Sequence, residues 1–320
     1  MNTVITRDIE LAAHALKSGQ VIGIPTETVY GLAANALYEP AVQQVFRVKG
    51  RPITNPLILH FPNQEAAFPY IKEFAEDLDR LALKFCPGPL TFLVPKTHLV
   101  PDIITNGSPL VAIRFPSHPI FQSLMAEVDF PIAAPSANTY GSVSPTTSND
   151  VLKQLDGLIP MILDGGPCEF GLESTIVGMD GDSVVIHRLG SVDLDNIAVV
   201  LGYIPALKNQ TTDAPIAPGM VKYHYATTTP LYYFHQHQQP KASSGYIFLS
   251  EIPEGFDESV CITLSRDGDY KEIGRNLYQG LSAMDARGFD SLYIEQPQPI
   301  GLGVTILDRL NRATAKFLKD

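Results

Sequence analysis

Short apolar runs that begin or end near a proline recur through the first half of the chain, and this pattern constrains the fold more than any other. A proline at the end of such a run starts or stops a β-strand without removing a central hydrogen bond of the sheet. Segments with helical spacing of apolar residues lie between some of the runs, so the order predicts an α/β fold with helices packed on a mixed sheet. The predicted strands cover residues 20–25, 55–61, 89–95, 109–116, 130–137 and 159–166, and the predicted helices cover residues 9–17, 39–50, 73–85 and 118–128.

The composition of the chain changes after Leu201. Residues 174–190 predict a hairpin around an Asp-Gly turn, and the stretch from 203 is rich in Pro, Gly and polar residues, which is typical of a linker. We therefore predict a larger domain at 1–202, a linker at 203–229 and a small α/β domain at 230–320. In the small domain, strands are predicted at 230–236, 244–250, 259–265 and 291–296, and helices at 269–288 and 304–318.

Length, charge and cysteine usage bound the class of protein. A chain of 320 residues favours two domains, and 45% hydrophobic residues allow a large core. Cys86, Cys168 and Cys261 are scattered and odd in number, which argues against a disulfide framework or a Cys-rich zinc site and favours a reducing compartment. No signal peptide or membrane-spanning run is visible, so we expect a cytoplasmic protein without membrane contact. The formal net charge of −11 disfavours a broad nucleic-acid-binding face.

The segment KGRPITNPL, residues 49–57, contains the clearest chemical signal. Residues 40–64 include no Asp or Glu, although Arg47, Lys49 and Arg51 lie within five residues of one another. Cations at the end of a helix offset the helix dipole, so a solvated helix end is one explanation of this pattern.

Three further features of the segment favour a ligand. Pro52 and Pro56 hold the backbone extended, Asn55 adds an amide, and no local carboxylate is available to pair with the cations. Lysine offers a point charge and arginine a planar fork, and both bind phosphate. The hypothesis is a triphosphate site, in which positioning and charge neutralisation do the chemistry.

Polar groups at the ends of other apolar runs extend this hypothesis. The loop PTETVYG follows the first long run, and APSAN follows the run at 130–137. Arg114 ends a buried strand, where either a ligand carboxylate or a structural ion pair would satisfy it. Arg188 ends the second strand of the predicted hairpin.

Two nucleotide-binding motifs and one metal motif are rejected. GPCEFGLEST has the glycine spacing of a P-loop, but Leu172 and Glu173 stand where Lys and Ser/Thr belong, and a carboxylate there would repel phosphate. The G-x-G at Gly301 lacks a third glycine. His235 and His237 share one face of a predicted strand without a third ligand nearby, so we interpret them as exposed polar residues.

The order PTETVYGL, KGRPxxNPL, AIRFP, APSAN and ESTIV before HRLG resembles that of the YrdC-like family, over roughly residues 19–190. APGMVKYHYA and GLGVTILDRLNRA resemble the linker and closing segment of its two-domain members, the threonylcarbamoyl-AMP synthases. The resemblance implies an open twisted mixed-sheet domain with a large positive cavity, joined to a smaller Rossmann-like α/β domain. It also implies condensation of ATP, L-threonine and bicarbonate, with Mg²⁺, to L-threonylcarbamoyl-adenylate and pyrophosphate. The adenylate would feed separate machinery that modifies the adenosine next to a tRNA anticodon.

The resemblance also implies residue roles, with Lys49 and Arg51 in the catalytic position. Arg114 would hold the threonine carboxylate, and the metal would have no protein ligands of its own. The linker departs from the family pattern at Val221, Lys222 and Thr227, so either Tyr223 or Tyr225 is the expected aromatic contact. The implied ATP contacts are Arg51, Asn55, Leu110, Ser136, Ser144, Arg188 and Tyr223, and the implied threonine contacts are Thr28, His60, Arg114, Ala134 and Ser174, with Leu110 and Ala134 acting through backbone atoms.

Two rival functions remain at this stage. An RNA-binding module without chemistry would bind RNA with steep salt dependence, and the acidic balance disfavours it. A carbamoyl-transfer role like that of YrdC-like modules in hydrogenase maturation would come with Cys-rich zinc segments, which three scattered cysteines cannot supply. The sequence leaves direct tRNA binding, oligomeric state and the choice between threonine and serine open, since one methyl group is worth only about 1–3 kcal/mol.

Overall fold

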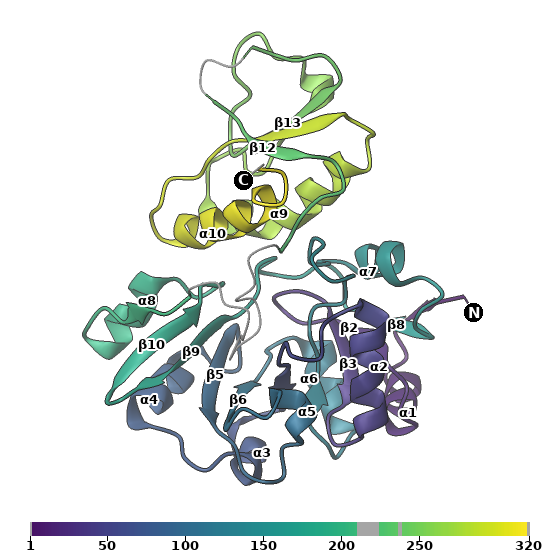
Figure 1. Ribbon diagram of the computed structural model, residues 1–320, viewed down its shortest axis with the longest axis vertical. Coiled ribbons are helices and arrows are strands. Elements are labelled where there is room, and N and C mark those ends of the chain that lie inside the picture. Colours follow the sequence, from purple (N-terminus) through teal and green to yellow (C-terminus); the bar gives the residue numbers. More distant parts are fainter. Residues whose placement is uncertain (1, 210–223, 236–238, 319–320) are drawn as a thin grey trace.

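The computed structural model describes residues 2–209, 224–235 and 239–318, and Figure 1 shows a larger lower part and a smaller upper part. The larger part is built on one mixed sheet of eleven strands in the order β1-β8-β2-β3-β7-β4-β6-β5-β9-β10-β11. Its strands are β1 (Val4–Thr6), β2 (Ile22–Ile24), β3 (Gly31–Asn35), β4 (Ile58–His60), β5 (Leu90–Pro95), β6 (Leu110–Arg114), β7 (Ile132–Ala133), β8 (Met161–Leu163), β9 (Thr175–Asp180), β10 (Ser183–Arg188) and β11 (Ala206–Leu207).

The helices of the larger part pack on this sheet around two main hydrophobic clusters. The bigger cluster includes residues of α2, α4 and α8, and the other includes residues of α1 and α6. These elements are α1 (Ile9–Lys17), α2 (Glu39–Lys49), α3 (Gln64–Ala67), η1 (Phe68–Tyr70), α4 (Glu76–Phe85), α5 (Asp102–Thr105), α6 (Pro119–Ala126), α7 (Ser148–Leu155) and α8 (Leu194–Leu201).

The smaller part has a four-stranded, fully parallel sheet in the order β12-β15-β13-β14. In Figure 1 its helices α9 and α10 lie between this sheet and the larger part. The parallel sheet with helices confirms the predicted small Rossmann-like α/β domain. Its elements are β12 (Leu231–Tyr233), β13 (Ser244–Phe248), η2 (Glu258–Val260), β14 (Cys261–Thr263), α9 (Tyr270–Asp285), β15 (Ser291–Ile294) and α10 (Leu302–Thr314).

The predicted α/β class and mixed sheet are confirmed, and each predicted strand and helix is present within a few residues. The sequence analysis did not anticipate several elements, namely β1, β3, β11, α3, α5, α7, α8, η1 and η2. The exact domain and linker bounds stay a prediction; β11 lies inside the predicted linker and pairs with β10.

Two further structural observations concern the compartment. None of the helices in the described residues is long and apolar enough to cross a membrane. Cys86, Cys168 and Cys261 are all free thiols, so no disulfide links the scattered cysteines.

Candidate active site

Strand alternation puts a row of polar side chains on one face of the large sheet. Val111 and Ile113 of β6 belong to the main core, so Arg114 faces the opposite side. His60 of β4 pairs with Arg114 on one side, and Thr91 of β5 pairs with Arg114 on the other. The sheet register alone therefore aligns three polar groups on the face away from the core.

His60 and Arg114 border a small hollow of about 50 Å³, to which Glu173, His224 and Tyr225 also contribute. A hollow of this size has room for one or two water molecules, so the large positive cavity stays a prediction. Eight predicted site residues line this one hollow: Thr28, Arg51, His60, Arg114, Ala134, Ser136, Ser174 and Arg188.

Arg51 is held against its own loop after α2. Its Nη2 donates to Asn55 Oδ1 at 2.7 Å and to the Pro56 carbonyl at 2.8 Å, and its Nε donates to the Asn55 carbonyl at 3.2 Å. Gly50 ends α2 with φ 61°, a left-handed conformation that glycine adopts without strain, and this turns the chain into that loop. Burial, reinforced by Arg188, lowers the pKa of Arg51 to about 10, so the guanidinium is charged at neutral pH. Asn55 thus orients the Arg51 guanidinium through these hydrogen bonds.

Lys49 lies beside Arg51 but is bonded to the loop after β7. Its Nζ donates to the carbonyls of Ser136 and Asn138, each at 2.6 Å, and to Asn138 Oδ1 at 3.0 Å. These three bonds use every donor of an ammonium group. Burial and then the Arg51 charge hold the pKa of Lys49 well below its usual value. Its contact with phosphate stays a prediction, and the contacts present make it the anchor of the Ser136 loop.

No carboxylate pairs with this cation segment in the part of the chain that the structure describes. None of the ion pairs there includes Lys49 or Arg51. Within the described residues, neither Lys49 nor Arg51 is therefore neutralised by a direct ion pair.

Arg114 makes the structural ion pair that the sequence left open. Its Nη2 lies 2.6 Å from Glu27 Oε1, and both side chains are buried. Glu27 Oε2 has no hydrogen-bond partner among the described residues. The pair fixes the guanidinium at the edge of the hollow, where it can still receive a ligand carboxylate.

His60 is a neutral neighbour of Arg114. Burial, and after it the Arg114 charge, lowers the pKa of His60 to about 3. Its Nδ1 lies 3.3 Å from the Ile132 carbonyl, which can only accept, so Nδ1 has the proton and Nε2 is an acceptor. Thr28 is fully buried nearby, with its hydroxyl 2.9 Å from that of Thr26.

Arg188 and Ser174 form the next wall. Arg188 Nη2 donates to the Ser174 carbonyl at 2.8 Å and to Ser174 Oγ at 3.0 Å, and Thr91 Oγ1 lies 2.7 Å from Ser174 Oγ. Burial lowers the pKa of Arg188. A third guanidinium thus borders the hollow, at the end of β10, in addition to Arg51 in the loop after α2 and Arg114 at the end of β6.

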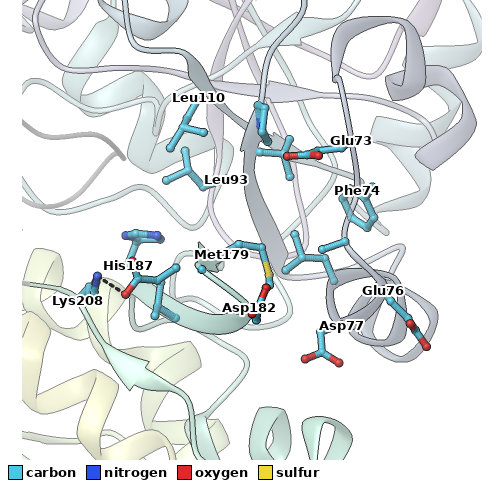
Figure 2. A pocket seen from close by; sticks show the side chains of 17 residues that line it. Glu73, Phe74, Glu76, Asp77, Leu93, Leu110, Met179, Asp182, His187 and Lys208 are labelled. Carbon is cyan, nitrogen blue, oxygen red and sulfur yellow. Dashed lines mark hydrogen bonds and ion pairs between the residues drawn. The ribbon is translucent and has the colours of Figure 1, made fainter.

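The remaining predicted contacts lie elsewhere. Ser144 does not line the hollow and donates to Glu173 Oε1 at 2.8 Å. Leu110 lies in a separate hollow of about 860 Å³ over β5, β9 and β10, beside Leu93 (Figure 2). Tyr223 lies outside the described residues. Tyr225, the alternative aromatic, is described and borders the hollow.

His224 and Tyr225 cover the hollow and are tied to the small domain. Tyr225 has φ 64° and is stacked on Tyr278 of α9, with ring centroids 5.5 Å apart. The Arg309 guanidinium lies 5.0 Å from the Tyr225 ring centroid. Burial, reinforced by nearby cations, lowers the pKa of His224 to about 3.

Sequence reasoning missed Glu173, His224, Tyr278 and Arg309 as parts of this site. Glu173 was noticed only as a residue that breaks a P-loop motif. Arg309 lies within GLGVTILDRLNRA, a segment quoted for its resemblance without a role. No local pattern signals that a residue of α10 reaches a loop more than a hundred positions earlier.

No group of three or more His, Cys, Asp or Glu side chains in the described residues is arranged to hold a metal ion. Glu173, the carboxylate at the hollow, already accepts bonds from Ser144, Tyr278 and Arg309. The site therefore fits Mg²⁺ only if the metal is held mainly by the oxygens of a bound phosphate chain.

Comparison with known proteins places the chain in a family. A family model described as "Telomere recombination" (Sua5_yciO_yrdC) matches residues 14–190, and the "Threonylcarbamoyl-AMP synthase, C-terminal domain" model matches residues 192–315. The chain belongs to the Sua5/YrdC family. Within it, the second match identifies the chain with the two-domain threonylcarbamoyl-AMP synthases.

Relatives along the whole chain agree. The threonylcarbamoyl-AMP synthase of Pyrococcus abyssi is 37% identical over 96% of this chain and 94% of its own, and that of Bacillus subtilis is 34% identical over 95% and 92%. The crystal structure of P. abyssi Sua5 complexed with L-threonine matches with a TM-score of 0.88 at 34% identity, over 98% of this chain and 97% of that one. A HypF structure matches at 24% identity with a TM-score of 0.51 over 57% of this chain and 29% of its own, which shows a shared fold only.

Proposed function

We propose that this protein is a threonylcarbamoyl-AMP synthase that makes L-threonylcarbamoyl-adenylate from L-threonine, bicarbonate and ATP and releases pyrophosphate. The observation that supports it most is the meeting of Arg51, Arg188 and Arg114 around one hollow, with neutral His60 beside Arg114. Two of these cations suit a phosphate chain and the third suits an amino-acid carboxylate. The P. abyssi relative, crystallised with L-threonine, supports the choice of substrate.

The threonine end of the site would be formed by Arg114, His60, Thr28 and Ser174. Arg114, fixed by Glu27, binds the substrate carboxylate, and the Nε2 of His60 accepts a hydrogen bond from the substrate amine or hydroxyl. The neutral amine of threonine then combines with bicarbonate to give a carbamate, with loss of one water molecule. No covalent intermediate with the protein is needed for this step.

The nucleotide end would be formed by the two guanidinium groups of Arg51 and Arg188 and by the Ser136 loop that Lys49 anchors. A carbamate oxygen attacks the α-phosphorus of ATP, the bond from that phosphorus to the bridging oxygen breaks, and pyrophosphate leaves. The arginines neutralise the charge that develops on the phosphate oxygens, which is electrostatic catalysis. Mg²⁺ bound with ATP would share that charge.

The cellular role is the one that the family resemblance implies. An acyl-adenylate is an activated group, and by that resemblance the product would be passed to a separate machinery that modifies the adenosine next to the anticodon of certain tRNAs. We place this work in the cytoplasm, in agreement with the three free thiols.

Pyrophosphate release by the purified chain with ATP, Mg²⁺ and bicarbonate, with and without L-threonine, tests the proposal. Lys49→Ala and Arg51→Ala should each reduce release strongly, whereas Arg47→Ala, an exposed cation two residues before Lys49, should not. Release that ignores threonine or bicarbonate would overturn the function. Equal loss in all three variants would overturn the placement of the phosphates.

The same assay separates the remaining alternatives. Replacing threonine with serine measures the value of the methyl group, which we expect to be about 1–3 kcal/mol in kcat/KM. RNA binding that falls steeply with salt, without pyrophosphate release, would instead favour the binding module.

A further inference from the structure

Glu173 occupies a position that a phosphate site tolerates poorly. Its carboxylate is 6% exposed and borders the same hollow as Arg51 and Arg188. An uncompensated negative charge beside a bound triphosphate would repel it through a medium that screens weakly. The site can bind ATP only if this charge is neutralised locally.

The neutralising groups come from the small domain. Arg309 Nε of α10 lies 2.9 Å from Glu173 Oε2, and the Tyr278 hydroxyl of α9 lies 3.1 Å from Oε1 and 3.0 Å from Oε2. Ser144 of the larger domain completes the set with a bond to Oε1 at 2.8 Å. Both carboxylate oxygens are therefore bonded.

Arg309 is fixed in this position by contacts on all sides. It is 1% exposed, its Nη2 donates to the Leu189 carbonyl at 2.5 Å, and its Nη1 lies 2.6 Å from Asp308 Oδ2. Its guanidinium also lies against the Tyr225 ring. A guanidinium group with this many partners has little conformational freedom to contact another carboxylate.

The charges around Glu173 agree with the geometry. Burial alone would raise the pKa of Glu173, but Arg309 first, and then Arg188 and His224, lower that pKa to about 2. The carboxylate is therefore ionised at every pH at which an assay would be run.

We propose that Arg309 and Tyr278 of the small domain complete the nucleotide side of the active site by neutralising and holding Glu173, and through Glu173 by positioning Ser144. This rests on the proposed function, and it makes Arg309 and Tyr278 positioning residues rather than catalytic ones. The bond from Thr305 Oγ1 to the Gly190 carbonyl and the one from Arg309 to Leu189 bind α10 to the segment after β10. The small domain thus supplies a cation in direct contact with Glu173, in addition to the charge of Arg188 nearby.

The alternative is that the Arg309–Glu173 pair only fastens the two domains together. The two ideas differ in which substrate the variants affect. If unpaired Glu173 repels ATP, Arg309→Gln raises the KM for ATP selectively, and removing the Glu173 charge as well restores it. If the pair only joins the domains, its loss acts through stability, so the KM values for ATP and threonine change together or not at all.

The experiment compares Arg309→Gln, Glu173→Gln and the double variant in threonine-dependent pyrophosphate release, with ATP and threonine titrated separately. Because a buried carboxylate loses its counter-charge, Arg309→Gln should raise the KM for ATP about tenfold or more and the KM for threonine by less than about threefold. The double variant should recover most of the ATP affinity. Arg275→Gln is the matched control, since Arg275 also crosses between the domains but donates to the Glu169 carbonyl at an exposed place.

The pH dependence of the KM for ATP provides a second test, because an ion pair that only joined the domains would not produce one. Without Arg309, burial raises the pKa of Glu173, so more of it is neutral at pH 6 than at pH 8. The KM for ATP of Arg309→Gln should therefore improve relative to wild type as the pH falls, and this pH dependence should vanish in the double variant.

Arg309→Lys keeps the charge and covers the case in which Arg309→Gln does not fold. If both variants fold, the KM of Arg309→Lys for ATP should be much closer to the wild-type value than that of Arg309→Gln. If only Arg309→Lys folds, its KM for ATP should lie within about threefold of the wild-type value. The proposal is overturned if Arg309→Gln leaves the ATP KM unchanged, if the double variant is no better than Arg309→Gln, or if Arg309→Lys loses ATP affinity tenfold. Wild-type protein without threonine-dependent release would overturn the proposed function instead.

Discussion

The buried ion pair between Arg114 and Glu27 gives a prediction whose magnitude follows from the structure. The side chains are 5% and 2% exposed, and their nearest N and O atoms are 2.6 Å apart. Removing one partner of a buried pair leaves an uncompensated charge, which costs about 3–5 kcal/mol. We expect Arg114→Gln and Glu27→Gln each to lower the free energy of unfolding by about this amount, and the double variant to lose clearly less than the sum.

The two single variants should differ in threonine binding. Arg114→Gln removes the guanidinium proposed to bind the substrate carboxylate, and a charge-assisted hydrogen bond contributes about 1.5–3 kcal/mol. The KM for threonine should therefore rise roughly ten- to hundredfold. Glu27→Gln retains the guanidinium and loses only its orientation, so its threonine KM should rise about threefold, which corresponds to less than 1 kcal/mol.

Two assays check this prediction. Urea denaturation of the ligand-free variants gives the stability change, and pyrophosphate release at saturating ATP gives the KM for threonine. Asp102→Asn is the control, since Asp102 pairs with Lys96 at an exposed place and should leave both values unchanged. A folded Arg114→Gln variant with wild-type threonine KM would refute the role of Arg114. Singles as stable as Asp102→Asn would refute the energetic reasoning.

Three other predictions use different parts of the site. His60 and His224 have pKa values of about 3 in the folded chain and about 6.5 when unfolded, so the free energy of unfolding should fall as the pH drops from 7 to 5, by roughly 2 kcal/mol for each histidine. In His60→Gln the urea midpoint should therefore depend less steeply on pH than in wild type, and an equal dependence would contradict the assignment. Gly190→Ala places a Cβ 2.3 Å from the backbone N of Thr175, so the Glu173–Ser174 segment must shift and ATP-dependent activity should fall at least tenfold, whereas Gly181→Ala in the open hairpin turn should change activity little. Tyr225→Phe removes a buried hydroxyl that has no hydrogen-bond partner among the described residues, so its melting temperature should be unchanged or higher; a clear decrease would show that the hydroxyl is bonded.

Elements with strong local signals were predicted correctly from the sequence. The helix at 9–17 has the bounds of α1, and Gly50 ends α2 as its position indicated. The missed strand β3 lacks such a signal: it reads GLAAN, whose small residues have little strand preference and are held by pairing with β2 and β7. The missed helix α7, in contrast, did have a local signal, the capping box of Thr147 and Asp150.

The site, like the fold, has features that local sequence predicts and features that it does not. Motif resemblance selected Arg51, His60, Arg114 and Ser174, and sheet register then brought His60 and Arg114 together on one face. The partner of each side chain could not be predicted, because bonds such as Lys49 to Ser136 connect positions 87 residues apart. Local sequence thus determines which groups are present, while strand order determines which of them meet.

Glu173 shows why contacts that local sequence does not reveal matter for function. From the sequence, a carboxylate at this position argued against a phosphate site, because a negative charge repels a phosphate. The physical reasoning was sound, but the compensating charge lies on α10, 136 residues later, with its Nε 2.9 Å from the carboxylate. On this proposal, a carboxylate next to the two arginines assigned to phosphate becomes compatible with ATP only when Arg309 of the second domain contacts it. For this reason the double variant of Glu173 and Arg309 is more informative than any single substitution in the larger domain, since it asks whether one active site is built from two folding units.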